Sequence, residues 1–454
     1  MTPIDPWQTA RPRGTASATP RPSGPRDRSP GVASRRLAAH ALDAVRRGVA
    51  LPEALARHTD AALGPADRAF ARRLAQQVLL QRNRLDARLA PALQRKPKPS
   101  WVRELLLLGL VQLEMPDVAD HAAVSATVEA APPPLRALLN AILRRAARGD
   151  LPVPDHRGVQ AQALAAGLPE WLLVQLRADW GDARDGVLAG SNQPPPLGLR
   201  VNLQRTTRAD YQRRLDAGGW ASEPVGEAGL VLPQMIDLGQ LPGFAEGEVS
   251  VQNASAQLAA AALPLAPGLR VLDACAAPGG KTAHLLEMEP ALDLLAVDAD
   301  AQRLSDVEAG LARLGLGARC EARALESLVD ERFDRILLDV PCSATGIMRR
   351  HPDIRWLRRA GDIGRLAAAQ AALLAHAWRL LEPGGLLLYA SCSILLAETE
   401  QVVAAFVDAT PGATVQPLNL PVGEALACGW RIPPGGAWDG FYYALLQREG
   451  SAPV

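Results

Sequence analysis

The sequence has almost no lysine, no paired cysteines and no long apolar run. Lysine occurs at three positions among the 49 basic residues of this 454-residue chain. The five cysteines form no Cys-X-X-Cys pair and are odd in number, which argues against a disulfide framework or a zinc cluster. No apolar run approaches the ~20 residues that cross a bilayer, and the first residues lack the apolar core of a signal peptide. We therefore expect a cytoplasmic protein without a bound metal or a membrane contact.

The formal net charge is +1, so the charge balance alone does not indicate a nucleic-acid partner. Arginine nevertheless gathers in one stretch beside Cys342. It contains Arg349, Arg350, His351, Arg355, Arg358 and Arg359. Part of the arginine excess reflects genome base composition, but the planar, permanently charged guanidinium suits phosphate contacts. We interpret this stretch as a substrate surface, with its first four members as candidate RNA contacts.

Composition and periodicity divide the chain into four segments. Residues 1–32 are rich in Pro, Ser, Gly and Arg, which predicts a disordered basic arm. Residues 33–150 repeat apolar residues at three- and four-residue spacing, which predicts an all-α domain. Residues 151–247 mix helix and strand patterns and are expected to form a small α+β connecting subdomain. Residues 248–454 alternate strands with helices, which predicts an α/β domain with a parallel sheet covered on both faces.

Two cysteines follow strands of this last segment, Cys342 in FDRILLDVPC and Cys392 in GGLLLYASC. A cysteine inside an apolar strand is most often a buried small hydrophobe. These two lie past the apolar run, because Pro341 precedes the first and serines flank the second. Open α/β sheets bind their ligands at the carboxyl ends of the strands. We therefore expect the two thiols to converge there.

A glycine-bearing turn, DACAAPGGKT, occupies residues 273–282. It is not a phosphate loop, because that motif requires glycine where Cys275 stands, and no GxGxxG is present. A nucleoside triphosphate or a nicotinamide is therefore disfavoured. The two glycines would let backbone amides approach a ligand closely. Asp298 ends the next strand, where a carboxylate can accept ribose hydroxyls. Together these features outline an S-adenosylmethionine site.

The motifs DACAAPGGKT, LLDVPCSATGIMRRHPDIRW and YASCSI, in this order, resemble those of RNA 5-methylcytosine methyltransferases that act on bacterial small-subunit ribosomal RNA. The segments HAAVSATVEA and LLNAILRR resemble a NusB-like RNA-binding domain, so the resemblance covers nearly the whole chain. It implies an all-α NusB-like domain followed by an α/β Rossmann-like, S-adenosylmethionine-dependent methyltransferase domain. The implied partner is 16S ribosomal RNA, free or in early assembly. A chain that carries its own RNA-binding domain is expected to be a monomer.

The resemblance also implies roles for single residues. Cys392 would add to C6 of cytosine, which makes C5 nucleophilic. Cys342 would assist release of the methylated base, and Asp339 would hold the N3 and N4 edge of the base. The residues implied to bind the cofactor are Cys275, Ala276, Ala277, Pro278, Gly279, Gly280, Lys281, Asp298 and Asp339.

Three places depart from the family pattern, and two alternatives stay open. First, Arg323-Ala324 stands where the family usually has Gly-Asp, whose aspartate contacts adenine, and Glu326 is a candidate substitute. Second, Glu398-Thr399 stands in place of Glu-Asn. Third, Asn253 stands in place of Asp. The first departure lowers the cofactor affinity that we expect. None of the three changes either of the two cysteines. The alternatives are the same chemistry on transfer RNA and a non-catalytic RNA-binding assembly factor. Nothing in the residues selects the target cytosine.

Overall fold

The computed structural model describes residues 31–95, 97–151 and 155–450, and the chain divides into two compact units. Of the described residues, the helical unit comprises those from 31 to 175 together with His351–Arg359. The sheet unit comprises Leu176–Arg350 and the described residues from 360 to 450. The expected disordered arm, residues 1–32, lies almost wholly outside the described residues. The domain boundaries expected from the sequence stay predictions.

The helical unit is all-α, as its apolar periodicity predicted. Its helices are α1 (Val32–Arg46), α2 (Leu51–His58), α3 (Pro65–Leu89), α4 (Trp101–Gln112), α5 (Asp120–Ala130), α6 (Arg136–Ala147) and α7 (Gly158–Ala166). Helix α4 is apolar on nearly all sides and buried along its length, so it forms the centre of the bundle. Glu104, fully buried on α4, is satisfied by Arg82 of α3 at 3.1 Å.

A short segment from the last third of the sequence belongs to this helical unit. Helix α14 (Ile354–Leu357) places Trp356 against the helical core, and its indole N–H donates to the carbonyl of Leu79 at 2.7 Å. The carboxylate of Asp353 accepts a hydrogen bond from the backbone N–H of Leu51 at 2.9 Å. The sequence pattern predicted that residues 248–454 form one segment. In the structure, residues 351–359 of that segment belong to the helical unit, because Asp353 and Trp356 contact its helices.

The sheet unit begins with a small antiparallel sheet in the order β2-β3-β1-β4. Two helices precede its first strand, α8 (Glu170–Trp180), which begins in the range of the helical unit, and α9 (Arg184–Asn192). The other elements are β1 (Leu197–Val201), α10 (Arg208–Ala217), β2 (Glu223–Val225), β3 (Gly229–Leu232) and β4 (Val249–Val251). Tyr211 of α10 is fully buried with Leu199 and Leu230 of the sheet. The expected mixture of strand and helix in this region is therefore present.

The large sheet has the order β11-β12-β13-β9-β8-β5-β6-β7, with β10 also pairing β13. Its strands are β5 (Arg270–Ala274), β6 (Asp293–Asp298), β7 (Arg319–Ala322), β8 (Phe333–Asp339), β9 (Leu381–Ser391), β10 (Ala413–Gln416), β11 (Glu424–Leu426), β12 (Gly429–Ile432) and β13 (Phe441–Arg448). Strands β5 to β9 pair in parallel, which confirms the predicted parallel sheet. The four C-terminal strands join antiparallel.

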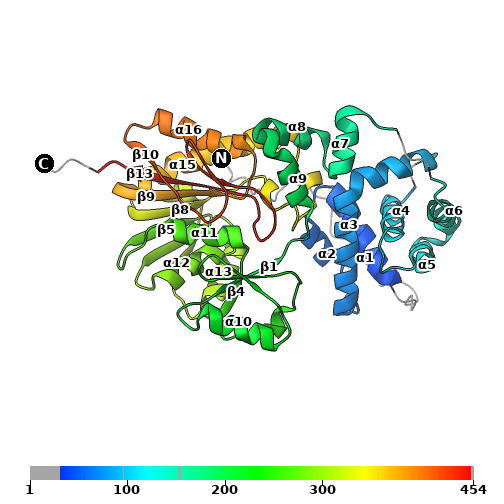
Figure 1. The fold of residues 1–454 in the computed structure, drawn as a ribbon, viewed down its shortest axis with the longest axis horizontal. Coiled ribbons are helices and arrows are strands. Elements are labelled where there is room, and N and C mark those ends of the chain that lie inside the picture. Colours follow the sequence, from blue (N-terminus) through cyan, green and yellow to red (C-terminus); the bar gives the residue numbers. More distant parts are fainter. Residues whose placement is uncertain (1–30, 96, 152–154, 451–454) are drawn as a thin grey trace. The chain divides into compact units, whose positions relative to one another are not determined.

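Helices cover both faces of this sheet, and adjacent strand residues alternate between them (Figure 1). The covering helices are α11 (Ala254–Ala262), α12 (Gly280–Met288), α13 (Ala301–Leu314), α15 (Ala360–Leu380) and α16 (Glu400–Ala409). Val271 packs toward α11–α13, whereas the next residue, Leu272, packs toward α15 and α16. Because the central strands are parallel, the loops after β5, β6, β8 and β9 emerge at one edge.

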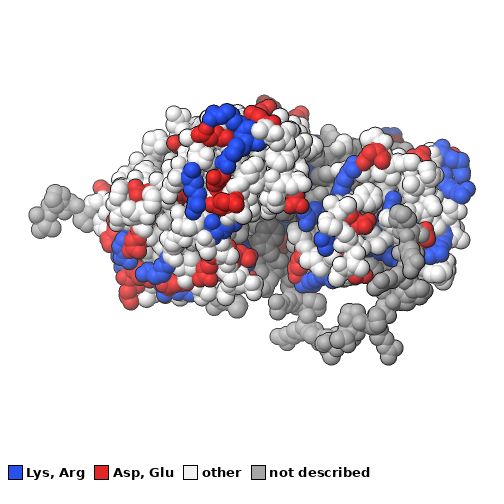
Figure 2. Space-filling view, turned by 90° about the horizontal axis from the view of Figure 1, so that it is seen from below, with Lys and Arg blue, Asp and Glu red and all other residues white. Residues whose placement is uncertain are grey.

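Charges of both signs are mixed on the face shown in Figure 2, in keeping with the net charge of +1. No broad field of one sign covers that face, so attraction of a polyanion there would depend on local groups. Among the described helices, none combines the length and apolarity needed to cross a bilayer.

Candidate active site

Two thiols meet at the carboxyl edge of the sheet. Strands β8 and β9 are parallel neighbours, so Cys342, three residues after β8, and Cys392, directly after β9, emerge side by side. Their Sγ atoms lie 3.3 Å apart. The backbone N–H of Gly346 donates to the carbonyl of Cys392 at 2.8 Å. A Cβ on Gly346 would lie 2.1 Å from the Gly440 carbonyl oxygen, so only glycine permits this approach.

The thiols are coupled through a hydrogen bond in which either sulfur can be the donor. With Cys392 as the donor, the hydrogen bond lowers the pKa of Cys342 and raises the pKa of Cys392 well above its usual range. With Cys342 as the donor, these roles exchange. The pair therefore readily loses one proton and resists losing a second.

Asp339 and Lys281 form an ion pair beside the thiols. The Lys281 ammonium donates to a carboxylate oxygen of Asp339 at 2.5 Å and lies 5.6 Å from the centre of the Phe441 ring. Burial is the largest single effect and would lower the pKa of Lys281, but the charge and hydrogen bond of Asp339, together with the charges of Cys392 and Asp273, outweigh it and the pKa is raised. Lys281 therefore carries a positive charge close to Cys392.

The glycine turn between β5 and α12 has an unusual backbone. Cys275 has a φ of 60°, the Ala277-Pro278 peptide is cis, and Gly279 has a φ of 89° as the N-cap of α12. Burial raises the pKa of the Cys275 thiol, so this cysteine is held neutral rather than reactive. The turn directs the N-terminus of α12 toward the strand edge, where backbone N–H groups favour an anionic group of a ligand.

Two carboxylates at this edge suit a nucleoside cofactor. Asp298, at the end of β6, accepts backbone N–H bonds from Ala277 at 3.1 Å and Asp300 at 3.0 Å, and its remaining lone pairs can accept ribose hydroxyls. Asp273, at the base of the turn, accepts from Thr282 at 2.6 Å. Its other oxygen has no partner among the described residues, and burial raises its pKa to about 7. The donor and acceptor set therefore fits S-adenosylmethionine.

The side expected to contact adenine differs from the family pattern. Arg323 pairs with Glu321 and Glu331, and Ala324 is the N-cap of a short 3-10 helix, Leu325–Ser327. Glu326 is exposed on that helix and close enough to raise the pKa of Cys275. Glu326 as the adenine contact stays a prediction.

Arg349 and Arg350, two of the expected RNA contacts, share one carboxylate. Their Nε atoms donate to the two oxygens of Asp439 at 2.5 Å each. The side chains of Arg349 and Asp439 are fully buried, and Arg349 also donates to the carbonyls of Gly436 and Trp438. The Arg350 side chain keeps 20% of its surface exposed. A phosphate can therefore reach Arg350 but not Arg349 in this conformation.

The other two expected contacts lie in the helical unit. His351 is half-buried, and Arg355 is fully buried with a hydrogen bond to the Gly167 carbonyl at 3.2 Å. Burial lowers the pKa of Arg355 to about 10. The buried position of Arg355 argues for a packing role, which sequence spacing does not reveal.

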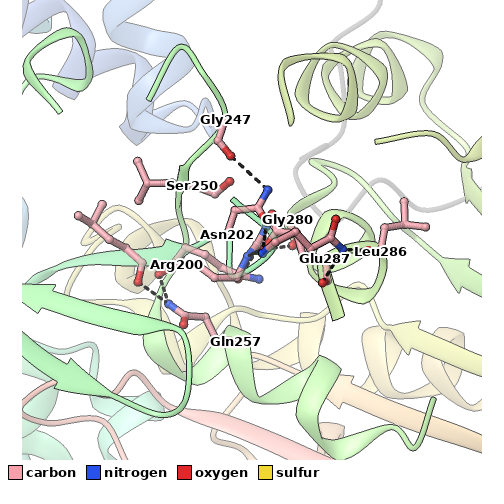
Figure 3. A network of polar contacts seen from close by, with 12 residues as sticks. Arg200, Asn202, Gly247, Ser250, Gln257, Gly280, Leu286 and Glu287 are labelled. Carbon is pink, nitrogen blue, oxygen red and sulfur yellow. Dashed lines mark hydrogen bonds and ion pairs between the residues drawn. The ribbon is translucent and has the colours of Figure 1, made fainter. Parts of the chain in front are cut away.

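A buried arginine braces the cofactor turn from the small sheet (Figure 3). Arg200 of β1 has no exposed surface and donates to both carboxylate oxygens of Glu287 on α12, at 2.7 and 2.8 Å. It also donates to the carbonyl of Gly280, the first residue of α12, at 2.7 Å, and to the side chain of Gln252. The side-chain amide of Gln204 donates to the Leu286 and Glu287 carbonyls at the end of α12. Both ends of α12 are therefore held.

Sequence reasoning assigned no role to Arg200, Asp273 or Glu398. Two signals were available for Glu398, its place in a family motif and the serine directly after each strand-end cysteine, because its side chain binds both serines. Arg200 carried no signal, because arginine is abundant in this chain. Asn253, noted as a departure, accepts a hydrogen bond from the N–H of Ala256 at 2.8 Å and caps α11 as an aspartate would. Within the described residues, no cluster of His, Cys, Asp and Glu could hold a metal ion.

Comparison with known families and structures agrees with this arrangement. Residues 260–447 match the family of the 16S rRNA methyltransferase RsmB/F. Residues 168–239 match the ferredoxin-like domain of RsmF/B-like methyltransferases, and residues 32–148 match the NusB family. The matches follow one another along the chain, as the resemblance implied.

Known proteins share this architecture over most of its length. The crystal structure of PH0851 superposes with a TM-score of 0.79 over 91% of this chain and 99% of that chain, at 22% identity. A methyltransferase homolog protein from Pyrococcus horikoshii, 26% identical, superposes with a TM-score of 0.57 over 65% of this chain and 100% of that chain. The ribosomal RNA small subunit methyltransferase B of Xanthomonas campestris is 42% identical over 92% of this chain and 98% of its own length. The chain therefore belongs to the ribosomal RNA small subunit methyltransferase B family.

Proposed function

We propose that this protein methylates C5 of a cytosine in 16S ribosomal RNA through a covalent adduct between Cys392 and C6. The observation that carries the proposal is the pair of thiols 3.3 Å apart at the sheet edge, beside a cofactor turn. Its relatives are named for methylation of small-subunit ribosomal RNA. S-adenosylmethionine, when bound, supplies the methyl group as a sulfonium.

Each residue beside the base has a distinct task. The Cys392 thiolate forms a bond to C6, and the electron pair displaced from the C5–C6 bond makes C5 the nucleophile that takes the methyl group. Asp339 lies at the end of β8 beside Lys281 and is positioned to hold the N3 and N4 edge of the base. Lys281 offsets the negative charge that develops next to Cys392.

Release requires loss of the C5 proton and cleavage of the bond between Cys392 and C6. A water molecule takes the C5 proton, the electron pair of the C5–H bond re-forms the C5–C6 double bond, and the electron pair of the breaking C6–S bond returns to the Cys392 sulfur. Cys342, within hydrogen-bond distance of that sulfur, supports this departure by donating its S–H. Cys392 therefore acts in the attack on C6, and Cys342 acts in the release of the methylated base.

Two substitutions test this division. Cys392→Ala should abolish methyl transfer, because no sulfur remains to activate C5. Cys342→Ala should trap a covalent RNA–protein adduct, seen as a band of reduced mobility in a denaturing gel. If Cys392→Ala instead gave the trapped adduct and Cys342→Ala gave none, the assigned roles would be reversed.

Bisulfite sequencing of ribosomal RNA tests the substrate. A strain that lacks the gene should show one additional cytosine converted to uracil in 16S ribosomal RNA, and restoring the gene should protect it. Methylation of naked transfer RNA but not of ribosomal RNA would favour the transfer RNA alternative. Absence of calorimetric S-adenosylmethionine binding would favour a non-catalytic assembly factor. A monomeric, cytoplasmic protein acting on free or partly assembled 16S ribosomal RNA is part of the proposal.

A further inference from the structure

Glu398 lies behind the two thiols in a fully buried position. It ends the short 3-10 helix Leu396–Glu398, and its side chain accepts hydrogen bonds from three residues. The donors are the Ser343 backbone N–H at 2.7 Å, the Ser343 hydroxyl, the Ser393 hydroxyl at 2.7 Å and the Gln370 amide at 3.1 Å. Four polar contacts therefore converge on this one carboxyl group, and its charge acts on the Cys342 thiol.

The two serines directly follow the two thiols. Ser343 is next to Cys342 and Ser393 is next to Cys392, so one carboxylate binds both cysteine-bearing loops. The serine hydroxyls also lie 3.3 Å from each other. Removing a carboxylate from water is costly, so a buried charge is weak evidence of a stabilising role. Its position between the thiol loops points to a role in the chemistry.

The charges around the thiol pair are arranged asymmetrically. The negative charge of Glu398 opposes a thiolate at Cys342, against hydrogen bonds from Ser391 and from the backbone of Ala344 that favour one, whereas the positive charge of Lys281 favours a thiolate at Cys392. Asp339 opposes ionisation of Cys392, but its charge is offset by Lys281 at 2.5 Å. The buried phenols of Tyr389 and Tyr443 also face the pair and stay neutral because burial raises their pKa.

We propose that Glu398 is a positioning residue that assigns the two thiols their roles, by holding both loops together and by keeping the shared proton on Cys342. Cys392 is then the sulfur that ionises, and Cys342 is the S–H that hydrogen-bonds to it. The proposal rests on the proposed function for its consequence in catalysis. The distribution of the proton can be measured without RNA or cofactor.

Competitive alkylation of the full-length protein tests the proton distribution. Substoichiometric iodoacetamide at neutral pH, followed by peptide mass spectrometry, reports which sulfur is the thiolate. The wild-type protein should be labelled mainly at Cys392. In Glu398→Gln, which removes the charge and keeps the shape, the ratio of Cys392 to Cys342 labelling should fall by about tenfold, because short-range charges in a buried site have effects of this size. Methyl transfer by that variant should also slow, because a protonated Cys392 cannot add to C6.

Glu400→Gln is the matched control. Glu400 lies two residues away in sequence and accepts a hydrogen bond from the backbone N–H of Cys428 at 3.1 Å. Its carboxylate therefore binds a different loop from the two that carry the thiols. This control should keep the wild-type labelling ratio. Glu398→Asp retains the charge and should recover at least part of the preference for Cys392.

An unchanged labelling ratio in a folded Glu398→Gln protein would overturn the proposal. Thermal melting shows whether the variant folds. If it does not, Ser393→Ala removes one hydrogen bond to the carboxylate and should lower the ratio by a smaller factor, and no change there would also overturn the proposal. Loss of methyl transfer by the wild-type protein would contradict the proposed function instead, since labelling requires no substrate.

Discussion

The Lys281 ammonium lies 2.5 Å from a carboxylate oxygen of Asp339, and this ion pair joins the cofactor turn to the strand that leads to Cys342. The two residues are far apart in sequence but adjacent in space, because β5 and β8 are parallel neighbours. The turn that we propose holds the cofactor and the strand end that we propose holds the base therefore share a charge pair.

Lys281→Met should lower the rate of methyl transfer by about 100-fold, the usual effect of removing one charge-stabilising group. The substitution leaves Asp339 without its cation and removes the positive charge beside Cys392. Transfer of a labelled methyl group to 16S ribosomal RNA measures the rate. Lys281→Arg keeps the charge and should retain more activity than Lys281→Met, and equal activity of Lys281→Met and wild type would contradict the role.

Arg200→Met should destabilise the protein by about 3–5 kcal/mol, because it leaves the buried carboxylate of Glu287 unpaired. The double variant Arg200→Met/Glu287→Met should recover much of this stability, since both charges are gone. The double variant should still bind S-adenosylmethionine more weakly than the wild-type protein, because the hydrogen bond from Arg200 to the Gly280 carbonyl is lost. Urea unfolding and calorimetry measure the two effects.

The exposed pair Arg213 and Asp210 gives the control for this experiment. Arg213→Met should change the free energy of unfolding by less than about 1 kcal/mol, as for most surface ion pairs. Wild-type cofactor affinity in the double variant would contradict a brace that acts on the turn.

His284 should make the protein less stable as the pH falls from 6.5 toward 3. Burial lowers its folded-state pKa to about 3, whereas its pKa in the unfolded chain is about 6.5. Below pH 6.5 the unfolded chain binds a proton that the folded protein does not, so the free energy of unfolding falls as the pH is lowered. Between pH 6.5 and pH 5 the loss is about 2 kcal/mol. His284→Gln removes this titration, so the difference in unfolding free energy between wild type and variant should shrink with acidification. A constant difference across this pH range would refute the prediction.

Trp356→Ala should destabilise the helical unit by about 3 kcal/mol, because it removes a large side chain packed on the helical core. Trp356→Phe keeps most of the ring and loses the hydrogen bond to the Leu79 carbonyl, so it should cost about 1 kcal/mol. Thermal melting of the full-length protein measures both. Leu138→Ala, at an exposed position of α6, should stay within about 0.5 kcal/mol of wild type.

Local patterns predicted the elements that carry the site. The apolar runs that end at Asp298 and Asp339 are strands β6 and β8, and the turn beginning at Cys275 lies between β5 and α12 as expected. These predictions succeeded because strand alternation and a glycine turn depend on neighbouring residues. Parallel pairing then requires the strand ends to meet, so the convergence of Cys342 and Cys392 could be predicted as well.

Burial and pairing of charges could not be predicted in the same way. Arg349 and Arg355 resemble surface arginines in sequence, yet one is buried against Asp439 and the other lies inside the helical unit. Glu398 was noted only as part of a departure from a family motif. The partners of these residues are distant in sequence, so no local pattern records whether a charge is neutralised.

The sequence by itself determined the order of the domains, the strands of the sheet, the cofactor turn and the two thiols, because each depends on short-range periodicity or on a contiguous motif. Only the tertiary structure decided the 3.3 Å separation of the thiols, the carboxylate of Glu398 behind them and the inclusion of residues 351–359 in the helical unit. These features arise from packing between segments that are distant in sequence, where burying a charge without a partner is costly.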